Sequence, residues 1–177
     1  QAVFEVIAHE VAHQWFGNLV TMHWWDDLWL NEGFASWMAS KVTDALHPEW
    51  KPWLRMVASS RERAMRLDAG SATHPVVRPL DSIEAVNQAF DAIAYSKGEA
   101  VIRMIEVAVG ETGFRDGIRG YIRKHAYANT ITDDLWRELE AASGKPITAI
   151  AHDFTLQPGV PLVTIEAAEC DAATTKL

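Results

Sequence analysis

The sequence predicts a mainly α-helical fold with a short β segment near the C-terminus. Apolar residues recur at three- and four-residue steps through most of the 177 residues, glycines and prolines interrupt these runs, and one short run of β-branched apolar residues stands out. Apolar types make up 49% of the residues and charged types 23%, which is a globular composition. We therefore expect packed helices rather than disorder or a coiled coil.

Three helices are predicted in the first seventy residues. The first ends near Phe16, because Gly17 and Asn18 follow as a stop signal, and its apolar positions are Val3, Phe4, Ile7, Val11 and Trp15. We expect Asn31 to cap the second helix, which ends before His47. The third covers about Glu49 to Leu67.

The middle of the chain is predicted to contain a loop followed by more helices. Residues 70–79 read as a loop, and Asp81 with Glu84 has the spacing of a capping box. Gly110 and Gly144 are placed as helix stops. The predicted helices are 91–109, 112–125, 133–142 and 147–154.

The character of the chain changes after Pro158-Gly159. The run Pro161 to Ile165 is short, apolar and β-branched, which favours a strand. We therefore divide the chain into a helical part, residues 1–157, and the incomplete start of a following β-domain, residues 158–177. The sequence starts at Gln1 within an apolar pattern, so we expect a piece of a longer polypeptide.

Composition excludes several classes of partner and metal site. The formal net charge of -8 argues against binding to nucleic acid or to an anionic membrane. Cys170 is the single cysteine, so neither an intramolecular disulfide nor a cysteine-based metal site is available. A metal must therefore be held by histidines and carboxylates.

Residues 9–13 read His-Glu-Val-Ala-His within the first predicted helix. His9 and His13 are four residues apart, which places both imidazoles on one helical face within reach of one ion. Glu10 lies about 100° around the helix, where it can act on a metal-bound water without being a ligand. The pattern predicts two metal ligands and a general base.

Glu32 is the predicted third ligand. It lies in the first turn of the second predicted helix, with eighteen residues between it and His13, and Gly33 beside it allows a close approach. A catalytic zinc ion takes three protein ligands and keeps a position for water. Two neutral imidazoles and one carboxylate leave net positive charge on Zn²⁺, which lowers the pKa of bound water towards about 7. We therefore predict one Zn²⁺ ion held by His9, His13 and Glu32.

These motifs resemble the M1 family of zinc aminopeptidases, the group of aminopeptidase N and the puromycin-sensitive enzymes. HExxH is followed after eighteen residues by the Glu of WLNEGFA. The likeness continues through HPVVRP at 74–79, FDAIAYSKG at 90–98, residues 121–129 and QPGVPLV at 157–163. HExxH is shared by many zinc proteases, whereas the Glu spacing and FDAIAYSKG are far more specific.

The resemblance implies the helical half of a thermolysin-like gluzincin catalytic domain that removes N-terminal residues from peptides. In it, water activated by the metal attacks the peptide bond, Glu10 is the general base, and Tyr95 donates to the oxyanion. Spacing alone supports Tyr95 less strongly, because a tyrosine with apolar neighbours usually packs in a core. The family's Gly-Ala-Met-Glu-Asn segment, which grips the substrate's free amine, is not among these residues. We therefore expect zinc binding with reduced peptidase activity.

Two other function classes stay open: an M1-like hydrolase of another type, such as an epoxide hydrolase, and a noncatalytic interaction module on the same fold. The expected partners are peptide substrates, the missing parts of the parent polypeptide and, through exposed apolar surface, further copies of the chain. We expect a cytoplasmic location and no contact of this segment with a membrane, although the parent can be membrane-anchored.

The remaining histidines are interpreted as surface or loop residues: His23, His47, His74, His125 and His152. None has metal-ligand spacing to a carboxylate or to another histidine. Asp26 and Asp27 are either support for a ligand imidazole or part of a solvated turn.

Overall fold

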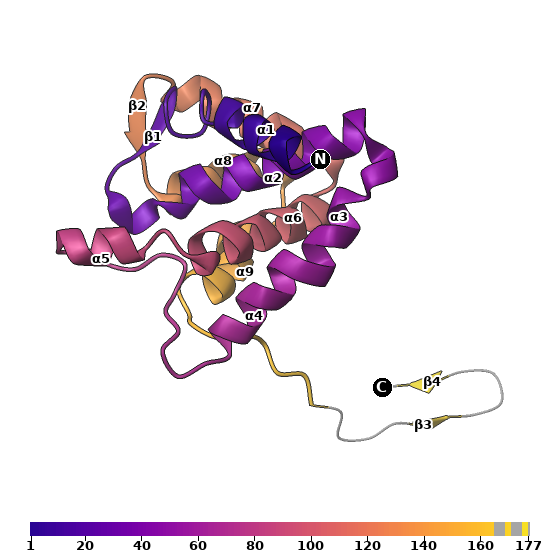
Figure 1. The fold of residues 1–177 in the computed structure, drawn as a ribbon. Helices are drawn as coiled ribbons and strands as arrows, with labels where there is room; N and C mark the ends of the chain where they lie inside the picture. Colours follow the sequence, from indigo (N-terminus) through magenta and orange to yellow (C-terminus); the bar gives the residue numbers. More distant parts are fainter. Residues whose placement is uncertain (165–168, 171–174, 177) are drawn as a thin grey trace.

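The computed structural model describes residues 1–164, 169–170 and 175–176, and it is mainly helical, as predicted (Figure 1). Short 3₁₀ turns (η1 and η2) and π-helical turns (η3 and η4) lie between or within the helices. The helices are α1 (Ala2–Ala12), η1 (Trp25–Asp27), α2 (Trp29–Leu46), η2 (Pro48–Trp50), α3 (Pro52–Arg55), η3 (Met56–Arg61), α4 (Glu62–Asp68), α5 (Ile83–Gln88), η4 (Ile93–Lys97), α6 (Gly98–Val109), α7 (Glu111–His125), α8 (Thr132–Ser143) and α9 (Ile147–Thr155). The strands are β1 (Val20–Met22), β2 (Ala128–Thr130), β3 (Glu169–Cys170) and β4 (Thr175–Lys176).

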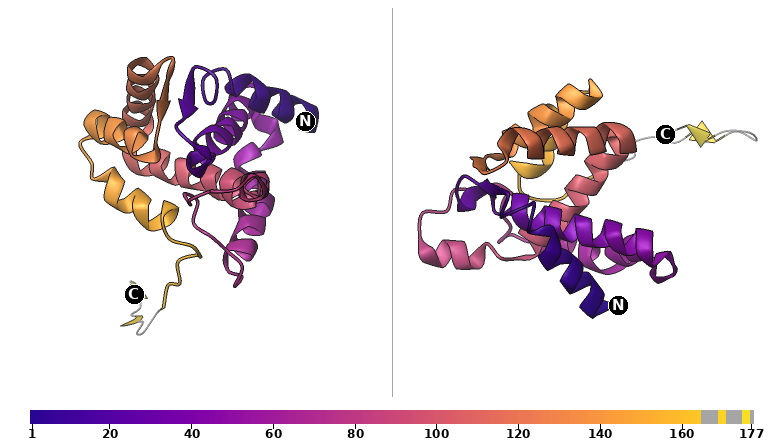
Figure 2. Two further views of the ribbon diagram at one scale, coloured as in Figure 1. Left: turned by 90° about the vertical axis from the view of Figure 1, so that its left-hand side faces the viewer. Right: turned by 90° about the horizontal axis from the view of Figure 1, so that it is seen from above.

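Helix α2 lies at the centre of the helical body. It packs against α1 on one side and against α6 and η4 on the other, an arrangement that the views in Figure 2 also show. Its buried apolar side chains include Trp29, Phe34 and Trp37, and these join a core that continues through α6, α7, α8 and α9. Burial of this much apolar surface is the main source of stability for the fold.

Helices α2 and α6 approach most closely at two glycines. A Cβ atom on Gly33 would lie 3.1 Å from the backbone of Gly98, and a Cβ atom on Gly98 would lie 3.3 Å from the Cα of Gly33. Both positions therefore leave little room for a side chain. This close approach brings Glu32 of α2 next to η4, the turn that carries Tyr95 and leads into α6.

A short parallel pair of strands, which the sequence analysis did not predict, lies beside the helices. Val20 pairs with Ala128 and Met22 with Thr130, so β1, which follows α1, is joined to β2, which follows α7. Three residues per strand are too few to show the alternating apolar pattern that identifies a strand in a sequence. The pair fixes the position of the chain segment that leaves α1.

Most predicted helices are confirmed, and the errors concern their ends. Helix α1 ends at Ala12 rather than near Phe16, because residues 13–16 form a turn that leads into Gly17. Asn31 is not a cap: α2 starts at Trp29, so Asn31 lies inside its first turn. The cap of α5 is Ser82, whose hydroxyl accepts from the backbone N–H of Ala85, one residue after the predicted Asp81.

The predicted strand at the C-terminal end is wrong for its described part. Residues 161–164 form no regular structure and run away from the helices, while Ile165 lies outside the described residues (Figure 2). Further on, β3 and β4 pair in an antiparallel ladder. The division of the chain at residue 157 stays a prediction.

In the part of the chain that the structure describes, no helix combines the length and the apolar character needed to cross a bilayer. The expected cytoplasmic location stays a prediction.

Candidate metal centre

Three side chains from α1 and α2 converge on one point. The Nε2 atom of His9 lies 3.2 Å from the Nε2 atom of His13 and 3.2 Å from Oε2 of Glu32, and the third side of the triangle, from His13 Nε2 to Glu32 Oε2, is 3.5 Å. The structure therefore brings together the three residues that the sequence predicts as ligands. Among the described residues, this is the cluster of histidine and carboxylate groups with donor atoms close enough to share an ion.

The triangle has the dimensions of a tetrahedral zinc site. Zn–N and Zn–O bonds of 2.0–2.1 Å at tetrahedral angles separate two donor atoms by about 3.3 Å. Without a cation, two imidazole nitrogens and a carboxylate oxygen at these distances direct several lone pairs at one point, and a single proton satisfies only one of the contacts. The donor set thus fits a divalent cation with its fourth position open.

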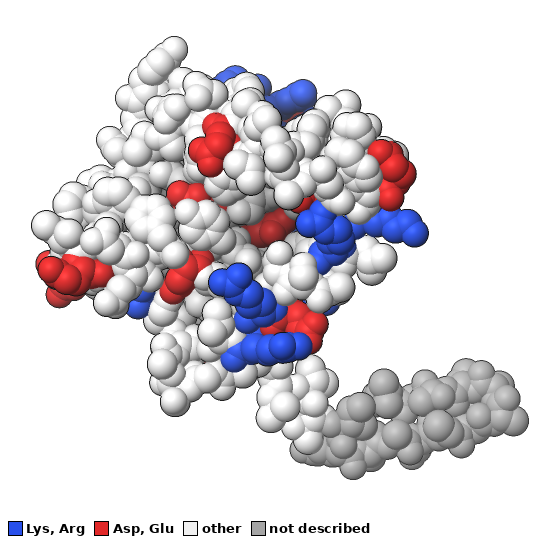
Figure 3. All heavy atoms as spheres, in the orientation of Figure 1, with Lys and Arg blue, Asp and Glu red and all other residues white. Residues whose placement is uncertain are grey.

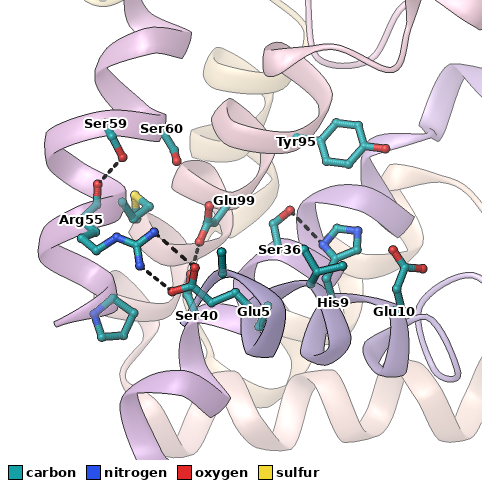
Figure 4. Close-up of a pocket in the computed structure, with 15 residues that line it drawn as sticks. Glu5, His9, Glu10, Ser36, Ser40, Arg55, Ser59, Ser60, Tyr95 and Glu99 are labelled. Atoms are coloured by element: carbon teal, nitrogen blue, oxygen red, sulfur yellow. Dashed lines mark hydrogen bonds and ion pairs between the residues drawn. The ribbon is translucent and has the colours of Figure 1, made fainter. Parts of the chain in front are cut away.

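Each imidazole is oriented by a contact at its other nitrogen. Nδ1 of His13 donates to the carbonyl oxygen of Phe16 at 2.9 Å, which leaves Nε2 of the neutral ring as a lone-pair donor to a metal. Nδ1 of His9 lies 3.4 Å from Oγ of Ser36 on α2 (Figure 4). Gly17 makes the first contact feasible, because its φ of 129° turns the chain back after α1 so that the Phe16 carbonyl faces His13.

The Glu32 side chain is buried, with 8% of the residue exposed. Burial alone raises the pKa of the Glu32 carboxyl, but its contacts with His9, His13 and Tyr95 outweigh burial and lower the pKa below the usual value. Glu32 is therefore a carboxylate at neutral pH, as a metal ligand requires.

Tyr95 and Glu10 border the same centre. The rings of Tyr95 and His9 are nearly parallel, with centroids 6.0 Å apart and an interplanar angle of 15°. Burial and the neighbouring carboxylates of Glu32 and Glu10 raise the pKa of the Tyr95 phenol, so it stays protonated and can donate a hydrogen bond. In Figure 4 the Glu10 carboxylate lies beside the His9 imidazole, and the Tyr95 ring lies above both. Glu10 is exposed and free to contact a ligand.

The turn that carries Tyr95 is a π-helical segment held at both ends. At its start, Oδ1 of Asp91 accepts from the backbone N–H groups of Ile93 and Ala94, at 2.8 and 3.1 Å. The other oxygen of Asp91 lies 2.6 Å from Nε2 of His74 in the preceding loop. Isolated π-helical turns occur often at functional sites, and this one has fixed partners.

At the end of the turn, Lys97 forms an ion pair with the buried Asp68, at 2.7 Å. Asp68 also accepts from the hydroxyl of Thr73 and from the backbone N–H of Gly159. These contacts tie η4 to the end of α4 and to the segment after α9. They explain the place of Lys97 in FDAIAYSKG, which spacing alone does not reveal.

The structure also corrects one interpretation and adds residues that sequence reasoning missed. Asp26 accepts from the backbone N–H of Leu80, and Asp27 accepts from the backbone and hydroxyl of Thr132, so neither supports a ligand imidazole. Ser36 and the Phe16 carbonyl have that role instead. Neither carries a sequence signal, because a backbone carbonyl has no side-chain identity and a helical serine is common.

Comparisons with known proteins identify the family of the chain. The Peptidase family M1 domain matches residues 1–154. The chain belongs to peptidase family M1. Its relatives include "Aminopeptidase 2" of Candida albicans, 47% identical over 94% of this chain, and "Aminopeptidase M1" of Arabidopsis thaliana, 47% identical over 93%. "Leucyl aminopeptidase" of Saccharolobus solfataricus is 45% identical over 92% of the chain.

The chain spans about a fifth of the length of these family M1 relatives: 18% of the first two proteins and 21% of the third. The matched region contains the donor triangle, Glu10 and Tyr95.

Proposed function

We propose that this chain supplies the zinc centre and the catalytic residues of an aminopeptidase, with His9, His13 and Glu32 as ligands of one Zn²⁺ ion. The observation that carries the proposal is the donor triangle formed by Nε2 of His9, Nε2 of His13 and Oε2 of Glu32, with sides of 3.2, 3.2 and 3.5 Å. Both imidazoles are also held in place by contacts at Nδ1. The names of the family M1 relatives support peptide N-termini as the substrates.

When bound, zinc polarises the scissile carbonyl and makes water acidic enough to lose a proton near neutral pH. The chain's own residues then move the protons. Glu10 accepts a proton from the attacking water and transfers it to the leaving amine, because it is one residue from a proposed ligand and lines the same cavity as His9 and Tyr95. Glu10 is not among the proposed ligands, so its carboxylate is free to accept and release the proton.

Tyr95 stabilises the negative charge that develops on the carbonyl oxygen. Its phenol is protonated and half-buried, and η4 fixes its position through Asp91 at one end and Lys97 at the other. A fixed donor directed at developing charge contributes about 10²–10³ in rate, because no reorganisation is needed when the charge appears.

The isolated chain is proposed to bind zinc and to hydrolyse peptides more slowly than its longer relatives. The ligands, Glu10 and Tyr95 are all within it, whereas the relatives are about five times longer. Segments that orient the substrate contribute strongly to the rate by fixing its position.

The decisive experiment compares Glu10→Gln with the unaltered residue in the full natural polypeptide that contains this chain. We expect bound zinc to stay at one ion per chain while hydrolysis of an aminoacyl-anilide falls by roughly 10² or more. Metal analysis and the anilide assay are read on the same sample. Unchanged hydrolysis by the zinc-loaded Glu10→Gln variant refutes the proposed role and favours a noncatalytic module.

A further inference from the structure

We propose that the cavity beside the metal centre binds the cationic side chain of a lysine or arginine that flanks the scissile bond, and that Glu99 is the specificity-determining residue. The inference rests on the proposed peptidase function and adds a substrate class to it.

The cavity opens from the metal centre between α1, α2, α3 and α6. Its volume is about 390 Å³, which exceeds what a lysine or arginine side chain needs. His9, Glu10 and Tyr95 line one part of it, and Glu99 and Ser40 line another (Figure 4). In Figure 3 this face of the molecule is hollowed, with acidic side chains in the hollow. A peptide cleaved at the metal centre therefore has a neighbouring side chain within reach of the cavity.

Glu99 lines this cavity although only 6% of the residue is exposed. Its Oε1 atom accepts from the hydroxyl of Ser40 at 2.6 Å, and no described residue donates a hydrogen bond to Oε2 or forms an ion pair with it. Burial raises the pKa of the Glu99 carboxyl, and the Ser40 hydrogen bond offsets only part of that effect. A buried carboxylate without a cationic partner is rare and unfavourable.

Glu106, two turns further along α6, shows how this helix normally compensates such a group. Its residue is 3% exposed, and its carboxylate accepts from Lys41, Arg103 and the indole of Trp37. These contacts outweigh burial and lower the pKa of Glu106. Glu99 has the same chemistry and burial with one neutral partner. A cation from outside the chain would complete it in the same way.

The charges of the cavity favour a cation. Its lining contains the carboxylates of Glu5, Glu10 and Glu99 and one guanidinium, that of Arg55. Arg55 donates to both oxygens of Glu5, at 2.9 and 3.2 Å, so it does not neutralise Glu99. Apolar lining residues, among them Val6, Ala39 and Met56, provide contacts for the methylene groups of a long cationic side chain.

A binding measurement tests the cavity without relying on catalysis. The probes are n-butylammonium and neutral n-butanol, titrated calorimetrically into the zinc-loaded natural polypeptide that contains this chain. We expect n-butylammonium to bind at least tenfold more tightly, and Glu99→Gln to remove that difference, because a hydrogen bond to a charged group is lost. The matched control, Glu84→Gln on the exposed face of α5, leaves binding unchanged. Equal affinity for both probes overturns the proposal.

A crystal of the unaltered protein soaked in n-butylammonium gives a second readout that does not depend on how the variant folds. We expect the ammonium nitrogen within hydrogen-bond distance of Glu99 Oε2. Density elsewhere, with none at Glu99, overturns the proposal.

Peptide hydrolysis separates this inference from the proposed function. Peptides carry lysine or its uncharged analogue norleucine on either side of the scissile bond. We expect Glu99→Gln to lower kcat/KM about tenfold for a lysine peptide at one of the two positions and to leave the norleucine peptides unchanged. An equal fall for both types means that Glu99 binds the α-amine or is structural, which overturns the inference. Failure of the unaltered enzyme to cleave any peptide refutes the proposed function instead.

Discussion

The two helices that carry the proposed zinc ligands are packed in opposite ways. Helix α2 is enclosed, with Trp29 and Phe34 almost completely buried and α6 in backbone contact at Gly33. Helix α1 is covered by α2 on one face, while its other face exposes large apolar side chains: Val3 at 74%, Val6 at 59%, Ile7 at 57% and Val11 at 51%. Glu32 thus lies on a helix that is enclosed by the core, whereas His9 and His13 belong to a segment that is packed on one face only.

This difference indicates which parts of the site the chain fixes by itself. Glu32 and Tyr95 lie on elements locked by the glycine contact and by ion pairs, so their relative position is part of the fold. His9 and His13 depend on how α1 sits on α2, which the Phe16 carbonyl and Ser36 help to set. A bound cation would join the two halves, because it takes ligands from both helices.

The largest expected effect is a fall in the catalytic rate when Tyr95, which lies on the enclosed side of the site, is changed. Tyr95→Phe in the full natural polypeptide is expected to lower kcat by 10²–10³ while zinc content is unchanged, because one hydroxyl donor to the oxyanion is lost. The matched control is Tyr127→Phe, which removes the hydroxyl of a tyrosine that is 93% exposed and should leave the rate unchanged. Steady-state hydrolysis of an aminoacyl-anilide measures both. A fall of less than threefold for Tyr95→Phe contradicts its role.

The contact between α2 and α6 comes next. Gly33→Ala places a methyl group 3.1 Å from the backbone of Gly98, so we expect the metal-free protein to lose roughly 1–3 kcal/mol in the free energy of unfolding. Gly120→Ala in α7 is the control, since its new methyl group meets only the end of the Glu138 side chain and the helix gains about 0.5–1 kcal/mol. Urea denaturation measures both values. Stabilisation of both variants would show that the helices are not in close contact.

The ion pair between Lys97 and Asp68 contributes about 1–3 kcal/mol to the free energy of unfolding at neutral pH, and this contribution depends on pH. Burial raises the pKa of Asp68, but the contacts with Lys97, Thr73 and the Gly159 N–H lower it by more than burial raises it. The pKa in the folded state is therefore below the unfolded value. Ionised Asp68 therefore stabilises the fold above about pH 4, and this contribution is lost as the pH falls through the folded-state pKa.

Asp68→Asn tests this linkage. Its free energy of unfolding should lie below that of the unaltered protein at pH 7, and the gap should narrow at pH 3. A gap that stays constant between the two values shows that the charge of Asp68 is not what stabilises the contact.

The smallest effect is expected on the exposed face of α1. Ile7→Ala should change the free energy of unfolding of the chain by less than about 0.5 kcal/mol, whereas Ile105→Ala in α6, which is fully buried, should cost about 2–5 kcal/mol. If copies of the chain associate through α1, Ile7→Ala also lowers the association measured by sedimentation. A cost above 1 kcal/mol in a monomeric sample would mean that this face is covered.

The sequence predicts most of the helices and the convergence of His9 and His13, because both depend on local spacing. His9 and His13 need only helical geometry to converge, and the stops at Gly110 and Gly144 are confirmed by positive φ values of 90° and 68°. Gly33, where the sequence predicts a close approach without naming a partner, packs against Gly98 of α6. That Glu32 would join the histidines followed from ligand chemistry rather than from periodicity.

What the sequence does not predict depends on contacts between distant segments. Periodicity identifies the apolar positions of α1 without saying what covers them, and in the structure several of these side chains face outwards. The pair β1 and β2 joins residues more than a hundred positions apart. Glu99 and Asp91 acquire their roles from Ser40 and His74, which lie far from them in the sequence.

The central claim is that His9, His13 and Glu32 hold one zinc ion. Anomalous scattering at the zinc edge, from crystals of the protein supplied with zinc, tests it most directly. We predict one zinc peak per chain, within about 2.0–2.2 Å of the two Nε2 atoms and a Glu32 oxygen, and its loss in His13→Ala. Stoichiometric zinc in folded protein at any other position, or no zinc at all, would contradict the account.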